Sequence, residues 1–162
     1  MVSGKSTHTL GLDVDGVVYG WGADAYGQLG TGRVVFVPFP VKVLKIPAIA
    51  TFAAGDDHLA AVDTLGYVWT WGGSSYGKLG QRSRPETDAP GRVEGLGGVV
   101  EVAAGGQFTL ARKGDGSVWY WGTIPGVGSS TRPVRLAAIP AAATGIAAGE
   151  RHFLVLLGDG TV

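Results

Sequence analysis

The first residues with a recognisable chemical pattern are Gly4, Lys5, Ser6 and Thr7, which spell GKST. This string resembles the end of a phosphate-binding loop, in which backbone N–H groups and a lysine hold nucleotide phosphates. Such a loop also needs a glycine further upstream, a preceding buried strand and a following helix. Only three residues precede Gly4, and the residues that follow (HTLGLDV, 8–14) read as a strand. We therefore expect a structural loop here and no nucleotide site.

The histidines are the next candidates, as metal ligands or as acid–base groups: His8, His58 and His152. They recur at one position of a repeat that is described below, and would be spread around the molecule. The ligands of a zinc site instead converge on one point. The repeat explains the histidines without a ligand, so we predict no metal site and no cofactor.

Carboxylates and nucleophiles offer little more. Three aspartates precede a glycine in short turns, where an Asp side chain can cap its own backbone: Asp15, Asp115 and Asp159. Asp56 and Asp57 are adjacent, so their side chains point in different directions, and nothing favours a paired general acid and base. The absence of cysteine excludes disulfides, thiol nucleophiles and cysteine-ligated zinc. We predict that the protein is not an enzyme and has no catalytic residues.

The overall composition argues against a nucleic-acid-binding protein and against a membrane protein. Lys and Arg total 13, as do Asp and Glu, so the net charge is zero and nothing supports a nucleic-acid-binding surface. Apolar residues make up 45%, which indicates a folded chain, and 29 glycines and 8 prolines indicate many turns. No segment resembles a signal peptide, and no apolar run approaches the length of a membrane span. We expect a soluble protein without a membrane partner; its compartment stays open, with the cytoplasm as the default.

The elements that position these residues are copies of one unit. Segments of the same pattern begin at residues 8, 58, 108 and 152, at offsets of 50, 50 and 44 residues. Two of them read HTLGLDVDGVVYGWG and HLAAVDTLGYVWTWG. We treat the chain as a single domain, 1–162, with units at approximately 1–45, 46–95 and 96–139 and a partial unit at 140–162.

Each unit reads as short antiparallel strands. Apolar runs such as HLAAV and YVWTW are joined by DTLG or DVDG, whose glycine supplies the positive φ of a tight hairpin. Alternation puts Trp69 and Trp71 on one face of a strand and Val68 and Thr70 on the other, so the sheet is covered on both sides. Ala-Ala-Gly recurs with little side-chain volume, which indicates the crowded innermost strands of a β-propeller. We predict an all-β propeller of four-stranded blades, each about 50 residues long.

The combined pattern resembles the regulator of chromosome condensation type repeat, written AAG-x-x-H-T-L-A-L, D-G-x-V-Y-x-W-G and G-Q-L-G. The matching segments are AAGDDHLAAV and GYVWTWGGSSYGKLG in the second unit, and HTLGL, DGVVYGWG and YGQLG in the first. The resemblance covers essentially the whole chain and implies a β-propeller, typically of seven blades, used mainly for protein–protein recognition. Its structural repeat residues are the Trp-Gly pairs and the glycines of AAG: Trp21, Gly22, Trp71, Gly72, Trp121, Gly122, Gly55, Gly105 and Gly149.

The chain departs from this pattern in three places. Lys5 falls where other units have the glycine of AAG, so we expect the first inner strand to be missing or altered. The third unit lacks the G-Q-L-G loop, which explains its shorter offset of 44 residues. Val162 aligns with Val118, so we expect the chain to end inside a strand.

Three units and a fraction cannot close a ring, which leaves strand edges open to pairing with another chain. We favour a truncated chain or a fragment of a longer propeller. The alternative is that copies self-associate through their open blade edges and complete the ring together.

Variable residues in a constant frame mark the candidate binding surface. The two residues before each histidine position differ between units, which is what a contact surface carried by loops would show. We predict partner contacts at Asp56, Asp57, His58, Gln107, Glu150, Arg151 and His152. In family members that act as nucleotide-exchange factors for a small GTPase, acidic and histidine residues of this loop lie on the partner-binding face. By resemblance, Asp56, Asp57 and His58 match those positions best.

The function predicted from the sequence is therefore a non-catalytic scaffold that binds another protein. One alternative is a guanine-nucleotide exchange factor or regulator of a small GTPase. A second is a propeller-type protein inhibitor of an enzyme.

Overall fold

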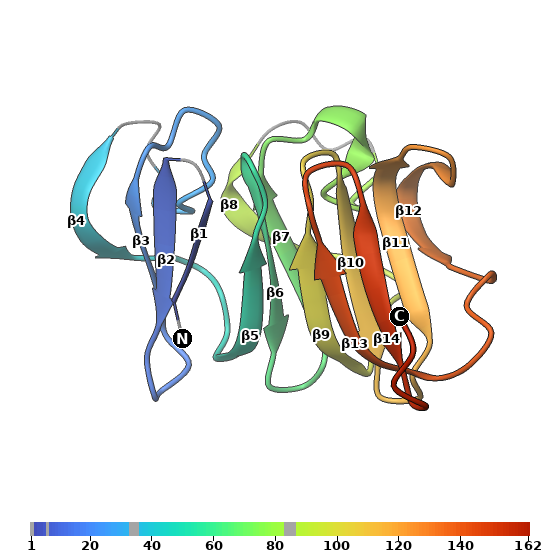
Figure 1. Cartoon of the computed structure of the whole chain (residues 1–162). Coiled ribbons are helices and arrows are strands. Elements are labelled where there is room, and N and C mark those ends of the chain that lie inside the picture. Colours follow the sequence, from blue (N-terminus) through green and yellow to red (C-terminus); the bar gives the residue numbers. More distant parts are fainter. Residues whose placement is uncertain (1, 6, 33–35, 83–86) are drawn as a thin grey trace.

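The computed structural model describes residues 2–5, 7–32, 36–82 and 87–162. Within these ranges the chain forms four antiparallel sheets, which follow one another in chain order as the blades of an open arc (Figure 1). A short 3-10 helix, η1 (Ser75–Gly77), is the one helical element of the described residues. The predicted all-β fold of four-stranded propeller blades is confirmed.

Three blades have four strands and the last has two. The first blade contains β1 (Val2–Lys5), β2 (His8–Leu12), β3 (Val18–Gly22) and β4 (Val37–Lys42). The second contains β5 (Ile49–Ala54), β6 (His58–Asp63), β7 (Val68–Gly72) and β8 (Thr87–Arg92). The third contains β9 (Val99–Ala104), β10 (Phe108–Lys113), β11 (Val118–Ile124) and β12 (Gly128–Arg135). The fourth pairs β13 (Ala143–Ala148) with β14 (Phe153–Leu157).

The Ala-Ala-Gly strands form the inner edge of the arc, where β5 contacts β1 and β9, and β9 contacts β13. A Cβ atom added at Gly55 would lie 2.8 Å from the carbonyl oxygen of Gly105. One added at Gly105 would lie 2.9 Å from the carbonyl oxygen of Gly149. A side chain does not fit at these distances, so glycine is required where the inner strands converge.

The first inner strand is present. β1 pairs with β2 from Val2 opposite Gly11 to Lys5 opposite His8, and so takes the place that β5 has in the second blade. Its sequence is altered but the strand is not missing. Gly4 and Lys5 lie in this strand, which β2 follows, so the helix that a phosphate-binding loop requires is absent from the described residues here.

Hairpin turns join the two middle strands of the first three blades, and a similar turn follows β14. The predicted aspartates cap two of these four turns. The carboxylates of Asp115 and Asp159 accept the backbone N–H groups of Ser117 and Thr161, each at 2.9 Å. In the first blade Asp15 lies in the turn as predicted, but Oδ1 of Asp13 accepts the N–H groups of Asp15 and Val17 in its place. Asp13 opens the turn, two residues before Asp15, and from there its carboxylate accepts two backbone N–H groups.

The apolar core lies between the blades. Leu10, Val18 and Val43 of the first unit pack against Phe52 and Trp71 of the second. Similar clusters join the second blade to the third and the third to the fourth. Trp71 and Trp121 have no exposed surface, so these two tryptophans of the Trp-Gly pairs are core residues. Because each inner blade is covered on both sides, its strands carry apolar groups on both faces.

The third unit lacks the G-Q-L-G loop because its last two strands are joined directly. β11 extends to Ile124 and β12 begins at Gly128, and the N–H of Val127 donates to the carbonyl of Ile124 at 3.1 Å. At the other end of the chain, Val162 follows a turn closed by the N–H of Leu157 and the carbonyl of Thr161. The expectation that Val162 lies inside a strand is therefore wrong. Over the described ranges, no helix has the length and hydrophobicity to cross a membrane.

Candidate protein-binding face

The loops between the two innermost strands of the blades lie at one end of the arc, the upper end in Figure 1. They include residues 55–57, 105–107 and 149–152. The connections β3–β4 and β7–β8 lie at the same end, whereas the Asp-Gly turns and the connections between blades lie at the other (Figure 1). We call the upper end the axial face.

A hollow of about 490 Å³ opens on the axial face. It brings together five of the seven predicted contact residues, from three successive blades: Asp56, Asp57, Gln107, Glu150 and Arg151. It is also lined by three side chains that the sequence did not single out: Tyr26, Tyr76 and Lys78. The N–H of Gly106 donates to the carbonyl of Glu150 at 2.9 Å, which joins the third and fourth blades at the floor of this surface.

His58 lies beneath the axial face and has no exposed surface. Its Nε2 is 2.9 Å from Oγ1 of Thr109 in the third blade, and that hydroxyl donates to the carbonyl of Lys78 at 2.9 Å. Because the only hydroxyl hydrogen of Thr109 is used in this bond, His58 must donate from Nε2 and carries no proton on Nδ1. Burial lowers the pKa of His58, which favours the same neutral ring.

Asp57 is held by Lys78, whose Nζ lies 2.7 Å from Oδ1 and 2.8 Å from Oδ2. The Lys78 residue is 2% exposed, so its ammonium needs this partner. Nδ1 of His58 is 3.8 Å from Oδ1 of Asp57, beyond hydrogen-bond length. Burial alone would raise the pKa of Asp57, but the ion pair with the Lys78 ammonium outweighs burial, and that pKa is lowered to about 2. Asp57 is therefore a charged residue that fixes the loop.

The two exposed tyrosines are presented by equivalent loops. In the first blade, the carboxylate of Asp24 accepts the N–H of Leu29 at 2.8 Å and the hydroxyl of Thr31 at 3.2 Å, which closes the loop around Tyr26. In the second, η1 carries Tyr76 at a φ of 64°. Tyr26 and Tyr76 are 47% and 57% exposed, and aromatic groups of this kind are enriched in protein interfaces.

The repeat family follows from a comparison with known families. A family model for the regulator of chromosome condensation (RCC1) repeat matches residues 15–62 and 66–112, and a second model of the same repeat matches residues 49–78. The chain belongs to the RCC1 repeat family. The resemblance found in the sequence is thereby confirmed.

Solved structures show the same fold as this RCC1-repeat chain. Human WBSCR16 matches with a TM-score of 0.87 and 26% identity, over 98% of this chain and 45% of its own. Yeast RCC1 (Prp20), solved with Kap60 bound, matches with a TM-score of 0.84 and 20% identity, over 99% and 42%. A second structure of Prp20p, from Saccharomyces cerevisiae, has a TM-score of 0.83 and 22% identity, over 99% and 43%; its description concerns binding to Gsp1p and histones. The chain thus spans less than half the length of these structures.

The three histidines of the RCC1 repeats share a position but not an environment. His8 is 3% exposed and neither ring nitrogen has a hydrogen-bond partner among the described residues. His58 joins two blades, and His152 is exposed. Neither His58 nor His152 lines the hollow, so the structure does not bring these two predicted contact residues into it. Within the described ranges, no cluster of three or more His, Asp or Glu side chains could hold a metal.

The repeat pattern of the sequence contains a signal for the two tyrosines. Tyr26 and Tyr76 recur at the same offset of 50 residues in YGQLG and YGKLG, yet both are exposed while the tryptophans of the same units are buried or half-buried. Lys78 carried no such signal, because the equivalent residue of the first unit is Gln28. Its role depends on a contact with Asp57, which belongs to a different loop.

Proposed function

We propose that this RCC1-repeat chain is a non-catalytic scaffold that binds another protein through its axial face. The observation that carries the proposal is the convergence of variable residues from three blades in one hollow. The frame beneath them is buried and constant: glycines at the inner edge and tryptophans between the blades. Residues that vary between units are not needed for folding, so they can differ in the contacts that they make with a partner protein.

The composition of the axial face fits a protein partner. Two exposed tyrosines supply apolar area with a polar tip, and the charged groups Asp56, Glu150 and Arg151 line the same hollow. Interfaces of this kind combine aromatic anchors with a charged rim. The buried titratable groups of the face, His58 and Lys78, are already engaged in contacts between loops and blades.

Affinity capture with a charge-reversed variant tests this proposal. The immobilised chain is compared with an Asp56→Lys/Glu150→Lys variant, and the bound proteins are identified by mass spectrometry. The control is Leu65→Lys, because Leu65 is 77% exposed on the hairpin turn at the opposite end. We expect a defined protein that the wild type and the control retain and the axial variant loses. Equal retention by all three chains would contradict the proposal.

A second candidate is a regulator of nucleotide exchange on a small GTPase. The fold shared with Prp20p and the family resemblance support this candidate, through the acidic loop of Asp56 and Asp57. The test is release of labelled GDP from a panel of small GTPases in the presence of the chain. Accelerated release that Asp56→Lys/Glu150→Lys abolishes would support it, and unchanged release across the panel would exclude it.

A further inference from the structure

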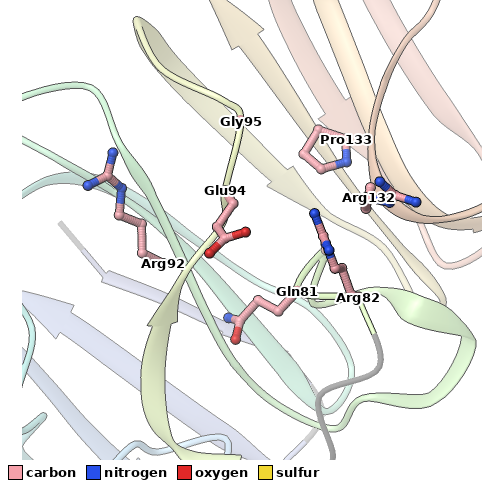
Figure 2. A pocket seen from close by; sticks show the side chains of 8 residues that line it. Gln81, Arg82, Arg92, Glu94, Gly95, Arg132 and Pro133 are labelled. Carbon is pink, nitrogen blue, oxygen red and sulfur yellow. The ribbon is translucent and has the colours of Figure 1, made fainter.

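A second cavity lies between the outer parts of the second and third blades, and none of its lining residues lines the hollow of the axial face. It has a volume of about 700 Å³ and is lined by Gln81, Arg82, Arg92, Glu94, Arg132 and Pro133, together with two glycines. Figure 2 shows Arg82 and Arg132 on one side of it and Glu94 between Arg92 and Gln81. We call it the interblade groove.

The interblade groove concentrates positive charge in a chain with no net charge. Three arginines line it against one glutamate. The Arg92 guanidinium stacks 3.6 Å above the ring centre of Tyr67, which orients it. Within the described residues, no carboxylate lies at ion-pair distance from Arg82 or Arg132. Both guanidiniums therefore keep all their donors available for an anion that enters the groove.

The preceding gap, between the first and second blades, provides an internal comparison for Arg82 and Glu94. With the repeat offset of 50 residues, Arg82 corresponds to Gly32 and Glu94 to Leu44. The gap between the first two blades therefore forms without an arginine at the first of these positions.

Strand pairing gives the same comparison for Arg132. Trp119 of β11 is opposite Arg135, and the equivalent Trp69 of β7 is opposite Arg92, so Arg132 of β12 corresponds to Ala89 of β8. Neither Arg82 nor Arg132 is thus required by the repeat fold. Arg82 and Arg132 occur together between the second and third blades, and the gap between the first and second blades has neither arginine at the equivalent positions.

The backbone at Arg82 is also unusual. Its φ is 61°, in the left-handed region that side chains rarely adopt, and the equivalent Gly32 has a φ of 75°. The first unit uses glycine at this position, which is free of the steric penalty. The chain instead carries a long cationic side chain where the fold favours glycine. A residue that keeps an unfavourable backbone conformation indicates that its side chain has a function.

We propose that the interblade groove binds an acidic peptide segment of a partner protein. Guanidinium groups pair with carboxylates through two parallel hydrogen bonds, and two separate arginines favour a ligand with at least two carboxylates. The volume is some twenty times the roughly 30 Å³ that a water molecule occupies, so a single small anion would leave most of the groove filled with water. A short chain with Asp or Glu side chains has the volume to fill the groove and carries several carboxylates to pair with both arginines. This site is independent of the axial face.

The test is fluorescence anisotropy with a fluorescein-labelled hexaglutamate peptide and a hexalysine control. The variant is Arg82→Gly/Arg132→Ala, in which both replacements copy the residue of the neighbouring repeat. Arg82→Gly also removes the left-handed side chain, so the fold is retained, and thermal unfolding followed by circular dichroism verifies this. The matched control is Arg151→Ala, which removes an arginine of the axial face.

We expect saturable, salt-sensitive binding of hexaglutamate to the wild type and the control, and at least a tenfold weaker Kd for the double variant. No binding of hexalysine is expected. The proposal is overturned if hexaglutamate does not bind, or if it binds the double variant as well as the wild type. It is equally overturned if inorganic phosphate or ATP displaces the peptide at lower concentration than unlabelled hexaglutamate does, because the groove would then be a phosphate site.

Discussion

The ammonium of Lys78 lies 2.7 Å from Oδ1 of Asp57, and this ion pair joins the β7–β8 connection to the β5–β6 loop of the same blade. The backbone carbonyl of Lys78 accepts the hydroxyl of Thr109, which in turn contacts the buried His58. One lysine thereby ties two loops of the second blade to the third blade. The shape of the axial face depends on this contact.

Replacement of Asp57 by alanine is expected to destabilise the protein. It leaves the ammonium of Lys78 buried without its partner, which costs about 2–4 kcal/mol of unfolding free energy. The measurement is the midpoint of urea unfolding. Glu150→Ala is the control on the same face, because the exposed Glu150 side chain should change stability by less than about 0.5 kcal/mol. Equal losses in the two variants would contradict the role of the ion pair.

Stability is expected to fall as the pH drops below 6.5, the ordinary pKa of histidine. Burial lowers the pKa of His58, so below pH 6.5 the unfolded chain binds more protons at this histidine than the folded chain does. His8 acts in the same direction, since its pKa is lowered first by burial and then by His58. The stability is fully present above pH 6.5 and decreases below it, by at most about 1.4 kcal/mol per pH unit for each histidine.

The variant His58→Phe isolates the contribution of His58, because Phe108 occupies the same repeat position in the third blade. We expect a shallower dependence of the unfolding free energy on pH between 6.5 and 5, whatever the absolute stability of the variant. An unchanged slope would show that His58 is protonated in the folded state.

Asp57 adds a second acidic phase. Its pKa is lowered from 3.8 to about 2, so its stabilisation is complete above pH 3.8 and is lost as the pH falls through 2. The shift corresponds to about 2 kcal/mol. Unfolding free energies of Asp57→Ala and the wild type should therefore converge at about pH 1, below the folded-state pKa, where Asp57 is protonated in both states. A difference that persists undiminished at that pH would rule out the charge as its cause.

Gly30→Ala is expected to destabilise the protein, because the first two blades pack too closely at Gly30 to leave room for a methyl group. A Cβ atom there would lie 2.9 Å from Nε1 of Trp71 and 2.9 Å from Cγ1 of Val43, at a φ of 62°. Gly32→Ala is the matched control, because its φ is 75° and nothing lies within 4 Å of an added Cβ. The control should lose about 1 kcal/mol from the backbone alone. Gly30→Ala should lose a further 1–3 kcal/mol or so, measured by urea unfolding. Equal losses would show that Trp71 does not crowd Gly30.

The fold was predictable because its signals are local. The alternation of Trp69 and Trp71 with Val68 and Thr70 defines a strand, and the glycine-containing turns (DVDG, DTLG and KGDG) define the hairpins of the first three units. The small residues ending at Gly55 indicated the inner edge, where the next glycine carbonyl lies too close for a side chain. Each of these inferences needs only the residues of one unit and their repetition.

The site was predictable only in part, because it depends on contacts between units. His58 and His152 hold the same repeat position, yet His58 is buried against Thr109 of the next blade and His152 is exposed. No pattern within one unit distinguishes them. The same is true of Lys78 and Arg132, whose neighbours come from other loops or blades.

Site-specific photocrosslinking tests whether the axial face is the surface that binds the partner protein. A photoreactive phenylalanine is placed at Tyr76 of the axial face, or at Leu65 of the opposite end; the two side chains are 57% and 77% exposed. We expect crosslinks to a defined partner protein from position 76. Excess wild-type chain should suppress these crosslinks, whereas an excess of the Asp56→Lys/Glu150→Lys variant should not. Crosslinks to that partner from position 65 alone, or equally from both positions, would contradict this expectation.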